Sequence, residues 1–89
     1  MTSEPGVKVC GVTRPEDAVR AWSAGAWAIG VVLSPGGPRS LDPSRASAVL
    51  AALPEGARRV GVFVAPDVDE VVGAVAALRL THVQVHAAT

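Results

Sequence analysis

The sequence predicts an α/β protein in which four parallel strands alternate with three helices, in the order βαβαβαβ. Three observations carry this prediction. Short runs of apolar, β-branched residues recur along the chain, apolar residues at helical spacing lie between them, and Gly, Pro or Asp marks the junctions. Strands that alternate with helices in this way form right-handed crossovers and therefore a parallel sheet.

The first strand and helix have clear boundary signals. We expect a strand over residues 7–10 and a helix over about 14–24. Thr13 is expected to cap that helix, with Glu16 reaching back in a capping box. Gly25 then supplies the left-handed backbone that favours a helix C-terminus.

The second strand and helix repeat the alternation. Residues 27–33 are apolar and β-branched, which is typical of a strand buried in a parallel sheet. The Ser-, Pro- and Gly-rich stretch 34–41 is a loop by every local signal. Asp42 and Pro43 open the next helix as a cap and a first-turn proline, and residues 54–56 end it.

Two strands and one helix complete the pattern. Residues 60–64 form the third strand and residues 82–86 the fourth. Between them, Asp67 with Glu70 repeats the capping-box spacing at the start of an amphipathic helix.

Alternation along the strands divides their side chains between two faces. One set is bulky and is expected to pack under the helices: Val7, Val9, Trp27, Ile29, Val31, Leu33, Val60, Val62, Val64, Val83 and Val85. The other is small, mixed and partly polar: Lys8, Cys10, Ala28, Gly30, Val32, Gly61, Phe63, Gln84 and His86. A doubly wound sheet is apolar on both faces, whereas a barrel turns one face inward and gathers polar groups at its C-terminal mouth. The pattern therefore favours the parallel βαβαβαβ half of a TIM (β/α)8 barrel, with Cys10, Ser34 and His86 at that mouth.

The length predicts one structural unit over residues 1–89, without a closed barrel. A closed eight-stranded barrel takes about 200 to 250 residues, and this chain has 89. Four strands leave the first and the last as open edges, which favour pairing with a second copy or with a complementary C-terminal half.

Composition excludes several classes of partner. The formal net charge is zero and no basic run occurs, so we expect neither nucleic acid nor an anionic membrane as a partner. The N-terminus has no signal-peptide pattern and the longest apolar stretch is too short to span a bilayer, which predicts a cytoplasmic protein. The single cysteine excludes an internal disulfide and a metal site built from cysteines.

The stretch Lys8-Val9-Cys10-Gly11-Val12-Thr13-Arg14-Pro15-Glu16-Asp17-Ala18 resembles the start of phosphoribosylanthranilate isomerases, the α/β-barrel enzymes of tryptophan biosynthesis. Further landmarks of that family follow in order: Gly25-Ala26 before Ile29-Gly30, then Pro38-Arg39, Val60-Gly61-Val62-Phe63 and Gln84-Val85-His86. The resemblance covers about residues 7 to 87, which is the N-terminal half of the family.

The resemblance implies an Amadori rearrangement, in which phosphoribosylanthranilate opens its ribose ring and becomes a carboxyphenylamino-deoxyribulose phosphate. It implies no cofactor and no metal. In the family the first-strand cysteine, here Cys10, is the general base that removes the sugar C2 proton. The loop arginine, here Arg39, pairs with the anthranilate carboxylate, and His86 lines the same pocket.

The resemblance also implies that this chain holds only part of the site. The family's general acid and its phosphate-binding loops belong to the second half of the barrel, so the 89 residues are not expected to catalyse the reaction well alone. This chain departs from the family pattern at three places. Family members usually have an acidic residue near the position of Trp27, an aromatic residue at the position of Ser40 and a glycine at the position of Ala87.

Other interpretations of the same residues stay open. Cys10 is alternatively a small, buried hydrophobic residue without a catalytic role. A role as a base requires a thiolate, which Lys8 on the same face is expected to stabilise. Arg39 has the alternative of a solvated loop residue. The chain as a whole is alternatively a non-catalytic half-barrel that assembles through its open edges, or a small doubly wound binding domain with helices on both sheet faces.

Overall fold

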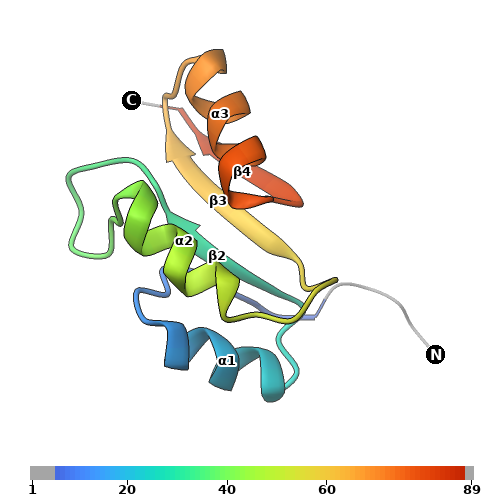
Figure 1. Cartoon of the computed structure of the whole chain (residues 1–89). Coiled ribbons are helices and arrows are strands. Elements are labelled where there is room, and N and C mark those ends of the chain that lie inside the picture. Colours follow the sequence, from blue (N-terminus) through green and yellow to red (C-terminus); the bar gives the residue numbers. More distant parts are fainter. Residues whose placement is uncertain (1–5, 88–89) are drawn as a thin grey trace.

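Four parallel strands and three helices make up the computed structural model, which describes residues 6–87 (Figure 1). Their bounds are β1 (Lys8–Val9), α1 (Pro15–Ser23), β2 (Ala28–Val32), α2 (Pro43–Ala51), β3 (Arg59–Val64), α3 (Val68–Leu78) and β4 (His82–His86). The strands lie in the order β1-β2-β3-β4 and every neighbouring pair is parallel. The predicted βαβαβαβ order is therefore confirmed, with element bounds that differ by at most two residues.

All three helices cover the same face of the sheet (Figure 1). Buried residues of α1, α2 and α3 share one core with side chains of β2 and β3, including Ala18, Val49, Leu78, Ile29 and Phe63. A strand order that follows the chain puts successive right-handed crossovers on one side. Within residues 6–87 the other face carries no helix. The doubly wound alternative is therefore wrong, because it requires helices on both faces.

The helix starts agree with the sequence in two cases out of three. The side chains of Asp42 and Asp67 each accept a hydrogen bond from the backbone N–H three residues later, at 2.8 and 2.7 Å, and so cap α2 and α3. The capping box predicted for α1 is wrong. Its N-cap is Arg14 rather than Thr13 and makes no side-chain cap bond. Glu16 instead accepts a hydrogen bond from the Arg14 guanidinium, which lowers the pKa of that carboxyl.

The face assignment predicted for β3 is inverted. Phe63 is 1% exposed and packs in the core beneath the helices, while Val60 and Val62 pack on the helix-free face. The register explains this result, since Val60 is the partner of Gly30 and paired residues on parallel strands share a face. Alternation alone divides a strand into two sets and does not tell which set lies under a helix.

Trp27 also lies elsewhere than predicted. It precedes β2 and packs with Ala28 in the cluster on the helix-free face, not under the helices. The Arg58 guanidinium lies 4.5 Å from the centre of its ring, and the His82 ring meets it edge-on at 5.5 Å. These contacts let an indole pack at the start of the strands without a place in the main core.

The described residues hold neither a long apolar helix nor a metal-ligand cluster. Among residues 6–87, no helix has the length and apolar composition needed to cross a membrane. No group of three or more His, Cys, Asp or Glu side chains gathers there in a metal-binding arrangement. Residues 1–5, on which the predicted absence of a signal peptide rests, lie outside the described residues.

Candidate active site at the carboxyl ends of the strands

Cys10 directly follows β1, on the face of the sheet that carries no helix. The thiol is half-buried and packs against the small cluster of Ala28, Val60 and Val62. Its sulfur lies 3.4 Å from the position that a Cβ atom on Gly30 would occupy. A side chain larger than methyl at Gly30 would crowd the sulfur, so glycine keeps the space beside the thiol open.

Arg39 lies against the residue that follows the cysteine. Gly11 has a φ of 81°, in the left-handed region, and a Cβ atom there would stand 2.6 Å from a guanidinium nitrogen of Arg39. Only glycine allows both this backbone conformation and this close approach. The amides of Gly11 and Val12 both donate to the Gly30 carbonyl, at 3.1 and 3.2 Å, and hold the turn in place. The fold thus places the Arg39 guanidinium against Gly11, the residue next to Cys10.

Two serines tie down the loop that carries Arg39. The Ser40 hydroxyl donates to the Ser34 carbonyl at 2.6 Å and accepts from the Gly37 amide at 3.1 Å. The buried Ser34 hydroxyl accepts from the Val64 amide at 2.7 Å. Ser34 therefore joins this loop to β3, and Ser40 has a local structural function that an aromatic side chain could not supply.

His86 lies at the end of β4, across the sheet from Cys10. Its Nε2 is 2.8 Å from the Gln84 side-chain nitrogen, and the Lys8 ammonium donates to Gln84 Oε1. The contact between Lys8 of β1 and Gln84 of β4 joins the two edge strands, so the helix-free face is concave. The strand pattern already places Lys8, Gln84 and His86 on one face, but no local signal indicates the link between Lys8 and Gln84 or the close packing of Gly11 on Arg39.

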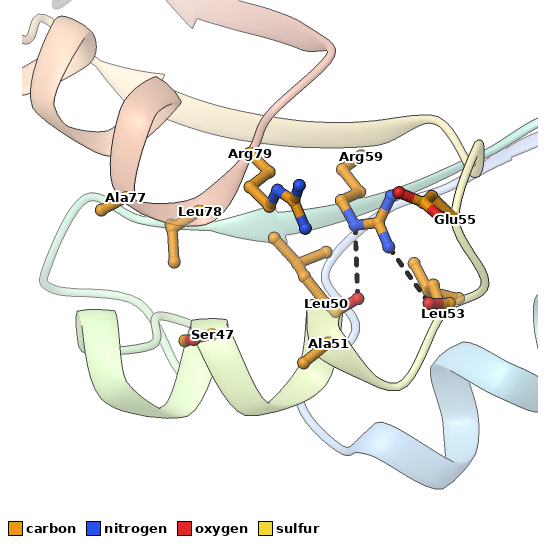
Figure 2. Close-up of a pocket in the computed structure, with 9 residues that line it drawn as sticks. All are labelled: Ser47, Leu50, Ala51, Leu53, Glu55, Arg59, Ala77, Leu78 and Arg79. Atoms are coloured by element: carbon orange, nitrogen blue, oxygen red, sulfur yellow. Dashed lines mark hydrogen bonds between the residues drawn. The ribbon is translucent and has the colours of Figure 1, made fainter.

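A cavity of about 520 Å³ lies elsewhere, between the C-terminal ends of α2 and α3 (Figure 2). Arg59 projects into it and donates to the carbonyls of Leu50, Leu53, Pro54 and Ala57. These bonds satisfy carbonyls at and just beyond the end of α2. Because Arg59 opens β3 on the helix-covered side, the cavity is at the opposite end of the strands from Cys10.

The arrangement defines the class of protein. A parallel sheet with helices on one face, and with reactive side chains at the carboxyl ends of its strands on the concave face, is the layout of α/β-barrel enzymes. The sequence profile described as N-(5'phosphoribosyl)anthranilate (PRA) isomerase matches residues 7–89. The chain belongs to this phosphoribosylanthranilate isomerase family.

Individual relatives agree with that assignment. The chain is 48% identical over 80 residues to the N-(5'-phosphoribosyl)anthranilate isomerase of Halorhodospira halophila. The matched stretch covers 90% of this chain and 39% of the relative. A crystal structure of the enzyme from Thermus thermophilus is 42% identical, with a TM-score of 0.84 over 93% of this chain and 42% of that one. A second crystal structure, of an isomerase in complex with reduced 1-(o-carboxyphenylamino)-1-deoxyribulose 5-phosphate, is 34% identical, with a TM-score of 0.88 over 96% of this chain and 44% of that one.

These comparisons confirm the predicted fold class, the parallel half of a TIM (β/α)8 barrel. They also set the extent of the match, because the chain spans about two fifths of the length of its relatives.

Proposed function

We propose that this chain is the N-terminal half of a phosphoribosylanthranilate isomerase of tryptophan biosynthesis. Residues 1–89 are proposed to form one unit that supplies four of the eight strands of the barrel. The observation that carries the proposal is the placement of the Cys10 thiol on the concave face, with the Arg39 guanidinium over the adjoining Gly11. The named relatives, and the solved isomerase that holds a reduced product-like ligand, support it.

Cys10 is proposed to act as the general base. As a thiolate it takes the C2 proton of the ring-opened iminium form of the substrate. The electrons of that C–H bond form the C1–C2 double bond, and the electron pair of the C=N bond returns to nitrogen. Transfer of a proton to C1 and loss of the hydroxyl proton at C2 then give the ketone. The rearrangement is internally redox-neutral and needs no cofactor.

Arg39 and His86 are proposed to bind the substrate. A guanidinium matches a carboxylate with two parallel hydrogen bonds, so Arg39 is suited to the anthranilate carboxylate. His86 lies at the opposite edge of the concave face and is proposed to contact the same small, phosphorylated molecule. The acid that opens the ring and the phosphate-binding groups are assigned to the rest of the barrel.

A complementary C-terminal half is the proposed partner, and it binds along β4. The side chains of Val83 and Val85 lie on the helix side of this edge strand and are 38% and 57% exposed. Unpaired strand edges with exposed apolar side chains favour addition of further strands. Four more βα units would pair with the edge and cover these valines. A cytoplasmic location remains a prediction of the sequence.

Complementation tests the proposal. The chain is mixed with the part of the Halorhodospira halophila isomerase that follows its matched 80 residues, and conversion of phosphoribosylanthranilate is measured. We expect activity in the mixture and in neither part alone, together with a one-to-one complex by sedimentation. A covalent fusion of the same two parts, the fusion enzyme, is the control. If a folded fusion enzyme is inactive, the proposed function is wrong; if only the mixture is inactive, or the chain pairs with itself instead, the proposed partner is wrong.

Two glycine variants test the position of Arg39 in the fusion enzyme. Gly11→Ala should raise the KM by about 10- to 100-fold, because the methyl group displaces a guanidinium whose charged hydrogen bonds are worth about 1.5 to 3 kcal/mol. Gly25→Ala is the matched control, since Gly25 also has a positive φ, 102°, but no atom lies within 4 Å of its added methyl. Both variants should lose about 1 kcal/mol of stability from the strained backbone. Equal KM values for the two would contradict the placement of Arg39.

A further inference from the structure

A chain of three polar side chains crosses the concave face. Lys8 of β1 donates to Gln84 Oε1, and the Gln84 amide nitrogen lies 2.8 Å from His86 Nε2. Lys8 and Gln84 are half-buried and 76 positions apart in the sequence. On β2, the residue paired with Lys8 is Ala28, which has a small side chain and lies on the same helix-free face.

The chemistry of these groups fixes the direction of both hydrogen bonds. A lysine ammonium has three donors and no acceptor, so it must face the carbonyl oxygen of the Gln84 amide. The NH2 group of the same amide then faces His86, and this group only donates. His86 Nε2 must therefore accept with its lone pair. A neutral imidazole that accepts at Nε2 carries its proton on Nδ1.

We propose that Lys8 and Gln84 are positioning residues that hold His86 as the neutral tautomer protonated at Nδ1. Within residues 6–87, no hydrogen bond uses this Nδ1, which leaves its proton free to donate to an oxygen atom of a ligand in the concave face. The tautomer itself follows from the donors and acceptors alone. That its Nδ1 proton serves the isomerase substrate rests on the proposed function.

Nitrogen-15 spectra of the histidine rings test the tautomer in the chain itself, without substrate. The chain has only two histidines, and His82→Gln removes one set of signals and so assigns the other. All spectra are recorded in the same buffer, so that the variants differ only in the substituted side chain. We expect His86 to carry its proton mainly on Nδ1. His82, whose Nδ1 contacts the Thr81 hydroxyl at 2.8 Å, is an internal reference.

Gln84→Glu gives the sharpest contrast because a carboxylate has no donor. Glu at this position still accepts from Lys8 but must also accept from His86, so the imidazole proton should move to Nε2. Lys8→Met, which frees the amide to turn round, should leave a mixture of the two tautomers. The His82 signals should change in neither variant. Circular dichroism checks that each variant keeps its secondary structure. A result from one folded variant, Gln84→Glu or Lys8→Met, is enough for the test.

The outcomes separate this proposal from the proposed function. A wild-type His86 protonated mainly on Nε2, or a tautomer that changes in neither variant, would overturn the positioning role whatever the enzyme assay shows. In the fusion enzyme, Gln84→Glu should raise the KM about tenfold with an unchanged free energy of unfolding. The reason is that Nδ1 of His86 then carries no proton to donate to an oxygen atom of the ligand. If the tautomer shifts as expected but the KM does not, Lys8 and Gln84 set the tautomer without serving the substrate.

Discussion

Cys10→Ala in the fusion enzyme should lower the turnover number by about 10²- to 10⁴-fold, which is the usual contribution of a positioned general base. The substitution removes the only thiol of the chain and leaves a methyl group beside Gly30 on the concave face. The Arg39 guanidinium over Gly11 keeps its place, so binding of the carboxylate should persist and the KM should change little. Steady-state conversion of phosphoribosylanthranilate measures both constants.

Stability measurements separate lost chemistry from lost structure. Cys10 is half-buried and packs against only a small cluster, so its change to alanine should cost less than about 1 kcal/mol of unfolding free energy. Cys10→Ser is a second control that keeps the size of the side chain but not the acidity of the thiol, and it should be nearly as slow as alanine. Activity that survives Cys10→Ala would defeat the assignment of the base.

Phe63→Ala should lower the free energy of unfolding of the chain by about 3 to 5 kcal/mol, the usual cost of emptying a buried phenylalanine site. Phe63 is 1% exposed and is one of the largest fully buried side chains of the core beneath the helices. Small domains have only about 5 to 15 kcal/mol of stability in total, so this single change removes a large part of it. Urea denaturation followed by circular dichroism measures the loss.

The neighbouring residue is the matched control. Val64 lies on the opposite face of the same strand and is 49% exposed, so Val64→Ala should cost less than about 1 kcal/mol. A loss below 1 kcal/mol for Phe63→Ala, or equal losses for the two variants, would contradict the observed orientation of β3.

Local patterns in the sequence predicted the elements well because the forces that set them are local. The apolar spacing identified all four strands and three helices, and the strand over residues 82–86 has the predicted bounds. Asp42 and Asp67 cap α2 and α3 as expected, since a cap bond joins residues only three positions apart. At the start of α1 a different local interaction forms. Glu16 accepts a hydrogen bond from the Arg14 guanidinium, and the predicted capping box does not form.

The candidate site was predictable only through the resemblance, and only in part. The alternation of side chains placed Cys10 and His86 at the carboxyl ends of strands, and the family motif added Arg39. Nothing in the local sequence predicted that Arg39 packs on Gly11, because that contact joins the first and second βα loops. The close approach of Arg39 to Gly11 is visible only in the tertiary structure.

The sequence by itself determined the order of strands and helices, the single open sheet, and the identity of the polar residues on the strands, because spacing and capping act over a few residues. Only the tertiary structure decided that Phe63 rather than Val60 and Val62 lies beneath the helices, and that Lys8 meets Gln84 across the concave face. The physical reason is that the alternation of side chains along a strand defines two faces but does not determine which face the helices cover. Strand register and packing between distant segments make that choice.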